Sequence, residues 1–209
     1  MRPFYFTQYI FVVHCISMHF KKTILPNGLR VITAPLKDSP TITALVLVET
    51  GSKYETKNLN GLSHFLEHMC FKGTTNRPTA MDITKELDGL GAQSNAFTGQ
   101  EYTGYWAKAQ AGNLDQILDI ISDIYINPLF DSVEIEKEKG VIVQEINMFE
   151  DMPMRHIYDI FMEVLYGNQP AGWHITGPKE GVVKFTREDF VAYRNKHYNT
   201  SSTIVAEYE

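Results

Sequence analysis

The chain has 209 residues, 44% of them hydrophobic, and a formal net charge of −6. This hydrophobic content excludes a disordered chain and is enough for a sizeable core in one domain or in two small ones. The acidic balance, with no basic cluster, argues against a nucleic-acid partner. The only two cysteines, Cys15 and Cys70, lie far apart, which argues against a disulfide framework and favours a reducing compartment.

The first seventeen residues differ from the rest of the chain. Residues 1–17 contain one basic residue, no acidic residue and an apolar run at 9–16. This run is too short to span a bilayer and lacks a small-x-small cleavage site, so we expect no stable membrane insertion. Met18 is an alternative start, which would make 1–17 an extension and 18–209 the domain. A cytoplasmic, bacterial-like protein is expected; the alternative is an organellar or exported protein if residues 1–17 are a targeting segment.

Periodicity and turn residues predict the elements that follow. The sequence at 26–28, Pro-Asn-Gly, is typical of a hairpin turn because Asn and Gly tolerate positive φ. The predicted strands are 20–25, 29–34, 41–49, 93–97, 102–108 and 202–208. The predicted helices are 62–71, 79–90, 114–126, 134–150, 154–165 and 186–197. Strands, then helices, then one late strand indicate an α+β fold, a largely antiparallel sheet with helices packed on one face.

A His-x-x-Glu-His string lies within the first predicted helix. Residues four apart share a helix face, so His64 and His68 can bind one metal ion, with Glu67 beside them. Zinc accepts histidine nitrogens and keeps a position open for a water that a carboxylate can deprotonate. The alternatives are a solvated helix face or a satisfied pair of core histidines, but polar groups buried among apolar neighbours cost free energy without a partner. This residue order is the inverzincin signature.

Catalytic zinc normally has three protein ligands, so a third ligand must come from elsewhere in the chain. Glu145 is the best candidate, because apolar residues at 141–143 and 146 indicate that it lies at the buried end of a helix. Glu138 lies two helical turns earlier and faces the same way. For Glu138 the alternative is a solvated helix face, because it belongs to a Glu/Lys run.

These residues give the chain a resemblance to the pitrilysin/insulinase family of zinc peptidases, in particular to its processing-peptidase branch. The segment 61–74, GLSHFLEHMCFKGT, is similar to the active-site helix of the family, and the resemblance runs from about residue 20 to the end. It implies that Glu145 is the third ligand and that Glu138 supports the site. Residues 91–98 are similar to an edge strand that binds substrate backbone, which implies substrate contacts for Asn95 and Ala96. Without the resemblance, a turn or edge role is an equal alternative for Asn95.

The family implies a zinc-dependent endopeptidase that hydrolyses extended peptides with a water activated by one zinc ion. Glu67 would act as general base and then as general acid, with Glu138 behind the ligands. Family enzymes contain at least two such units around a closed chamber, so a second peptidase domain or subunit is an expected partner. The alternative is a zinc-binding but inactive half, or a non-catalytic partner subunit of a processing peptidase.

Overall fold

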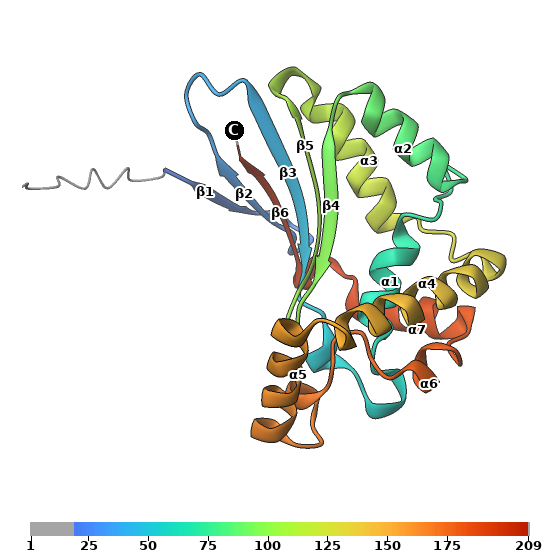
Figure 1. The fold of residues 1–209 in the computed structure, drawn as a ribbon. Coiled ribbons are helices and arrows are strands. Elements are labelled where there is room, and N and C mark those ends of the chain that lie inside the picture. The colour runs from blue at the N-terminus through green and yellow to red at the C-terminus, as the bar shows by residue number, and fades with distance from the viewer. Residues whose placement is uncertain (1–18, 209) are drawn as a thin grey trace, which may run out of the picture.

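The computed structural model describes residues 19–208. The expectations for residues 1–17, and for Met18 as the start, therefore lie outside the described residues. One layer is a six-stranded sheet, and helices lie on one side of it (Figure 1). Within residues 19–208, no helix combines the length and apolar character needed to cross a membrane.

The regular elements follow the predicted order. The strands are β1 (Lys21–Ile24), β2 (Arg30–Ala34), β3 (Thr41–Val48), β4 (Gln93–Thr98), β5 (Thr103–Gln110) and β6 (Thr203–Tyr208). The helices are α1 (Leu62–Cys70), α2 (Ala80–Gly89), α3 (Leu114–Ile126), α4 (Ser132–Glu150), α5 (Pro153–Tyr166), α6 (Lys179–Val182) and α7 (Arg187–His197). Each predicted strand and helix is present, whereas α6 and several short 3-10 turns were not predicted.

The sheet has the order β1-β2-β6-β3-β5-β4. The late strand β6 lies between β2 and β3, parallel to β2 and antiparallel to β3. The other neighbouring pairs are antiparallel. The predicted fold class, a largely antiparallel sheet with helices on one face, is therefore confirmed. β4 is an edge strand, because in this order it pairs with β5 alone.

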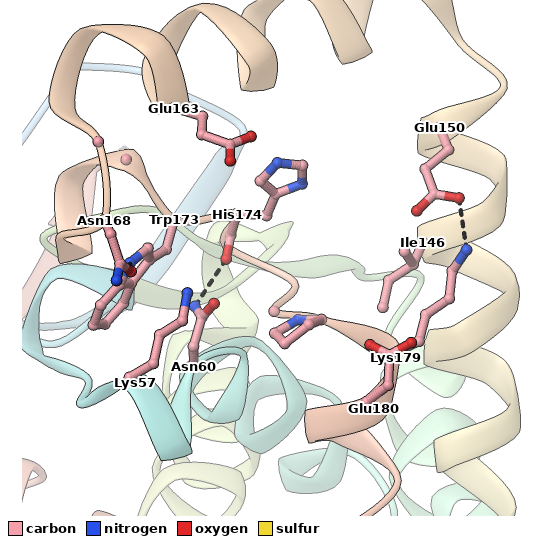
Figure 2. A pocket seen from close by; sticks show the side chains of 14 residues that line it. Lys57, Asn60, Ile146, Glu150, Glu163, Asn168, Trp173, His174, Lys179 and Glu180 are labelled. Carbon is pink, nitrogen blue, oxygen red and sulfur yellow. Dashed lines mark hydrogen bonds and ion pairs between the residues drawn. The ribbon is translucent and has the colours of Figure 1, made fainter.

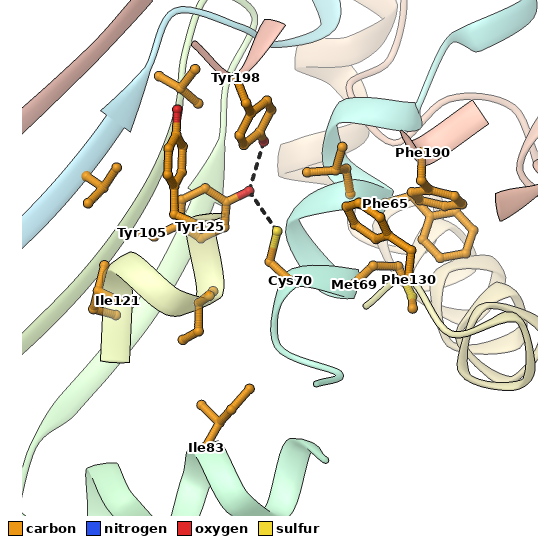
Figure 3. Packing of buried hydrophobic residues seen from close by; sticks show 14 of the residues in the cluster. Phe65, Met69, Cys70, Ile83, Tyr105, Ile121, Tyr125, Phe130, Phe190 and Tyr198 are labelled. Atoms are coloured by element: carbon orange, nitrogen blue, oxygen red, sulfur yellow. Dashed lines mark hydrogen bonds between the residues drawn. The ribbon is translucent and has the colours of Figure 1, made fainter. Parts of the chain in front are cut away.

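The core lies between the sheet and the helices. Alternate residues of β3 are buried, as expected for a strand with one face against helices. Helix α1 is inside this core: Phe65 packs edge-on against Phe190 of α7, and Met69 lies beside them (Figure 3). Cys70 points to the other side of α1, where its thiol donates to the Tyr105 hydroxyl at 3.6 Å. Burial raises the pKa of Cys70 to about 12, which fits a core residue rather than a metal ligand.

A buried ionic cluster joins the turn after α1 to helix α3. Arg77 donates to Asp123 at 2.9 Å, to Asp119 at 2.6 Å and to Glu86 at 2.9 Å. Asp123 also accepts a hydrogen bond from Thr74 at 2.5 Å. Burial raises the pKa of Asp123, but its hydrogen bonds outweigh burial and lower the pKa overall. Asp123 is therefore a buried, ionised carboxylate, and Arg77 is the cation that pairs with it.

Replacement of this arginine should destabilise the protein strongly. Arg77→Met leaves Asp123 buried without its cation, so we expect the free energy of unfolding to fall by about 3–5 kcal/mol in urea denaturation. Lys137→Met is a suitable control, because it removes only the exposed pair with Glu134 and should cost at most about 1 kcal/mol. Equal stability of the two variants would contradict the role given to Arg77.

Candidate metal centre

Two helices supply the candidate site. Helix α1 carries His64, Glu67 and His68, and nearly all of its residues are buried. Helix α4 packs against it and starts at Asp131, whose carboxylate accepts the first backbone N–H groups of that helix. This cap fixes the N-terminal end of α4. The helix is long enough to bring Glu145 to the histidines of α1.

Three donor atoms converge at one point. Glu145 Oε2 lies 3.5 Å from His64 Nε2 and 3.5 Å from His68 Nε2, and the three ligand atoms all lie within 4.8 Å of one another. Tetrahedral zinc with bonds of roughly 2.0–2.1 Å separates its ligand atoms by about 3.4 Å. The buried Glu145 Oε2 has no hydrogen-bond partner, which is unusual for a buried polar atom. The donor set and its spacing therefore fit one zinc ion.

The surroundings of Glu145 differ in part from the expectation. Ile142 and Ile146 are buried as predicted, but Val141 is half exposed and Glu145 itself is partly exposed. The helix end is therefore less buried than its apolar residues suggested. Contact with His64 lowers the pKa of the Glu145 carboxyl despite burial, so this carboxylate is ionised and suited to a cation.

Glu138 lies behind His68. Its Oε1 is 2.9 Å from His68 Nδ1, and its Oε2 is 2.6 Å from Lys72 Nζ. Glu138 is only 4% exposed, so the alternative of a solvated face is wrong for this residue. Burial raises the pKa of Glu138, but the bonds with His68 and Lys72 lower it overall. An ionised Glu138 can only accept, so its bond with His68 favours the tautomer that carries the proton on Nδ1 and the lone pair on Nε2.

Loss of this carboxylate should weaken metal binding without preventing it. We expect Glu138→Gln to lower zinc affinity about 10–100-fold, because the amide no longer fixes the tautomer and orientation of His68. Competition with a chromophoric chelator measures this affinity. Glu136→Gln is the matched control, since Glu136 lies on the same helix but pairs with Lys139 at the surface. The same affinity for both variants would rule out the role proposed for Glu138.

Glu67 is held from the side of the sheet. Thr98, the last residue of β4, donates its hydroxyl to Glu67 Oε2 at 2.5 Å. Burial raises the pKa of Glu67, and although Thr98 and the two histidines act against this, the pKa stays above its ordinary value. A raised pKa favours proton transfer by a carboxylate. The sequence does not single out Thr98, because its contact with Glu67 depends on the packing of β4 against α1.

The end of β4 lies beside the candidate centre. Asn95 and Ala96 line a cavity of about 300 Å³ together with Glu67, His68 and Glu138. Asn95 is exposed, and its side-chain oxygen accepts the backbone N–H of Ala96 at 2.8 Å. The structure therefore brings the predicted substrate-binding residues next to the predicted base. Within residues 19–208, no other strand pairs with the outer edge of β4, and an edge of this kind can pair with another chain.

A larger cavity, of about 720 Å³, lies elsewhere, between α4, α5 and the loop before α6 (Figure 2). Lys57, Trp173 and His174 are among its lining residues, and the Lys57 ammonium lies 4.8 Å from the centre of the Trp173 ring. None of the predicted metal or substrate residues lines it. The candidate site therefore adjoins the smaller cavity, where His68, Glu67 and Glu138 face an edge strand.

Sequence comparisons point to one family of proteins. Residues 30–179 match the family model described as Insulinase (Peptidase family M16). The uncharacterised zinc protease YmxG of Bacillus subtilis is 35% identical over 189 residues, which cover 89% of this chain and 45% of that protein. An uncharacterised zinc protease of Rickettsia felis is 41% identical, covering 90% of this chain and 45% of that protein. The mitochondrial-processing peptidase subunit beta of Caenorhabditis elegans is 39% identical, covering 88% of this chain and 40% of that subunit.

Solved structures show the same fold. A protease from Helicobacter pylori superposes with a TM-score of 0.85 at 27% identity, covering 91% of this chain and 46% of that one. Pitrilysin superposes with a TM-score of 0.83 at 20% identity, covering 94% of this chain and 21% of that one. At this identity the likeness shows the fold alone. The chain thus spans less than half the length of these relatives. Because the family model covers most of the chain and is supported by close sequence relatives, the chain belongs to the insulinase family of peptidases, peptidase family M16.

Proposed function

We propose that this chain is the zinc-binding, catalytic unit of a metalloendopeptidase. The observation that carries the proposal is the meeting of three possible metal-ligand atoms, from His64, His68 and Glu145, beside the carboxylate of Glu67. Two relatives bear the name zinc protease, which supports the same chemistry. The residues are those that a catalytic zinc site uses: three protein ligands and a nearby general base.

In the proposed reaction, Glu67 performs the proton transfers. Bound zinc would supply a water of lowered pKa and polarise the carbonyl of the peptide bond. Glu67 takes a proton from the attacking water and later gives it to the leaving amine. Thr98 occupies only Oε2 of Glu67, so Oε1 remains available for this proton. Glu138 acts at a distance from the reacting atoms, by holding His68 through Nδ1.

The substrate proposed is a peptide in extended conformation. It would add as a further strand to the free edge of β4, where Asn95 and Ala96 border the cavity. Backbone hydrogen bonds carry most of the recognition in this mode, so many side chains are compatible with it. Peptide hydrolysis would then occur beside this edge, where Glu67 and His68 lie.

We also propose that a second unit, on the same protein or on another subunit, completes the peptidase. The chain spans 45% of the Bacillus subtilis relative and 46% of the Helicobacter pylori protease. Helix α5 has no buried residue and exposes Met154, Ile157, Phe161 and Val164 by 57–87%. A contiguous apolar surface of this kind usually marks a contact with another protein surface. The same coverage favours one alternative, a zinc-binding half that is inactive by itself.

A reconstitution experiment separates these proposals. The chain is tested alone and mixed with the part of the Rickettsia felis relative that it does not cover, using a quenched fluorescent peptide with and without a chelator. Cleavage by the chain alone, lost on chelation and restored by zinc, would support a self-sufficient enzyme. Cleavage only in the mixture would support the alternative that the chain is a zinc-binding half, inactive by itself. Cleavage that persists in excess chelator would contradict the zinc mechanism, and zinc binding without any cleavage would favour a non-catalytic partner subunit.

A further inference from the structure

Glu55 is a buried carboxylate to which the proposed reaction gives no task. It is 4% exposed and lies between two 3-10 turns, Ser52–Tyr54 and Lys57–Leu59, that precede helix α1. Its Oε1 accepts the backbone N–H of Ser63 at 2.7 Å. Its Oε2 accepts the backbone N–H of Gly61 at 2.8 Å and the side-chain amide of Asn60 at 3.1 Å. All three partners are donors, which is the arrangement that an ionised carboxylate requires.

These bonds replace a cap that the helix otherwise lacks. The first N–H groups of a helix have no partner within it, and a side chain at the N-cap position normally accepts from them. The N-cap of α1 is Gly61, which makes no side-chain cap and has a φ of 98°. Glu55 accepts from this end of α1 instead, and a negative charge there interacts favourably with the helix dipole. Burial raises the pKa of Glu55 above its ordinary value, although the N–H groups of Ser63 and Gly61 act to lower it.

The other side of the same helix start is held by the loop before α6. The side chain of Asn60 also donates to the backbone oxygen of His174 at 2.9 Å (Figure 2). A Cβ on Gly61 would lie 2.4 Å from the Thr176 oxygen, and one on Gly177 would lie 2.2 Å from the Asn60 oxygen. The two backbones are therefore in direct contact. The start of α1 is fixed between Glu55 on one side and this loop on the other.

His64 depends on this fixed backbone more than His68 does. The ring of His68 is oriented through Nδ1 by Glu138, but Nδ1 of His64 is buried and has no hydrogen-bond partner. No hydrogen bond at Nδ1 therefore orients the ring of His64, and its direction follows from the position of the backbone. The residue before it, Ser63, is the one that donates its N–H to Glu55 at the shortest distance of the three.

We infer that Glu55 is a positioning residue of the metal centre, which sets the start of α1 so that His64 Nε2 meets Glu145. This inference rests on the proposed zinc site. Glu55 bonds to none of the three proposed metal ligands, so it acts through its bonds to the backbone N–H groups of Gly61 and Ser63 and to the side chain of Asn60. It differs in this respect from Glu138, which bonds to a ligand side chain directly.

The test is the zinc affinity of Glu55→Gln, measured by chelator competition, together with the visible spectrum of the cobalt-substituted protein. Glutamine keeps the shape but turns one acceptor into a donor facing an N–H group. We expect the folded variant to bind zinc at least about 10-fold more weakly and to show an altered cobalt spectrum. Glu49→Gln, an exposed carboxylate six residues earlier, is the matched control and should bind as the wild type does.

The outcomes distinguish this inference from the proposed function. A folded Glu55→Gln protein with lower thermal stability but unchanged zinc affinity and cobalt spectrum would overturn the positioning role and leave the zinc site intact. A wild-type protein that binds no zinc would overturn both. If Glu55→Gln does not fold, the zinc affinity of Asn60→Ala tests the inference instead. This variant removes one of the three donors to Glu55 and the bond to His174. A weaker zinc affinity there supports the inference, and an unchanged affinity contradicts it.

Discussion

Replacement of Glu67 by glutamine is expected to abolish peptide hydrolysis while the protein keeps its metal. Glu67 is not among the three groups that converge on the proposed zinc position, so its amide should leave zinc affinity nearly unchanged. The amide cannot accept the proton of the attacking water. General acid–base catalysis contributes about 10²–10⁴-fold, and we expect the turnover number to fall by a factor in this range. The measurement is the turnover of the reconstituted peptidase at saturating peptide, with zinc content determined on the same preparation.

The interpretation of that result depends on two comparisons. Glu136→Gln introduces the same chemical change at an exposed position of α4 and should keep full turnover. Retention of zinc in Glu67→Gln would show that the loss of activity is not a loss of metal. If Glu67→Gln hydrolyses the peptide as fast as Glu136→Gln does, Glu67 is not the base and the mechanism fails.

Replacement of Glu145 should have the largest effect on the metal itself. Glu145→Gln exchanges the one anionic donor of the three for a neutral amide. Loss of a residue that only orients a ligand costs about 10–100-fold in affinity, so loss of a ligand should exceed this range. A ligand that binds the folded state adds stability by mass action, about 2.7 kcal/mol at 100 times its Kd. Zinc should therefore raise the thermal unfolding temperature of the wild type and have little effect on Glu145→Gln.

Glu150→Gln provides the control for this experiment. Glu150 ends the same helix, but its carboxylate pairs with Lys179 at the surface. Zinc should stabilise Glu150→Gln as it stabilises the wild type. Equal zinc stabilisation of Glu145→Gln and Glu150→Gln would remove Glu145 from the ligand set and leave the third ligand unassigned.

The elements of the fold were predictable because their signals are local. The alternating residues of β3 and the proline and glycine turns lie within short windows, and most predicted ends fall within one or two residues of the observed ones. Helix α6 has only four residues, too few to show a period. The position of β6 between β2 and β3 depends on pairing across more than 150 residues of sequence, which no local pattern encodes.

The candidate site was predictable where its residues lie on the same helix, because helical spacing then places their side chains. His64 and His68 were placed together by helical spacing, and Glu145 by the buried character of its surroundings and by family resemblance. A supporting role of Glu138 was predicted from the family resemblance, but only the structure shows that its partner is His68. Thr98 and Glu55 have no signal in the sequence, because the first depends on the packing of β4 against α1 and the second on the path of the chain before α1.

The central claim is that His64, His68 and Glu145 hold one zinc ion. Elemental analysis of the purified 209-residue chain, after dialysis against a weak chelator, tests this most directly. We predict one zinc ion per chain in the wild type and in Glu67→Gln, and a content near zero in the double variant His64→Ala/His68→Ala. A wild-type chain without stoichiometric metal, or a double variant that retains it, would contradict the account.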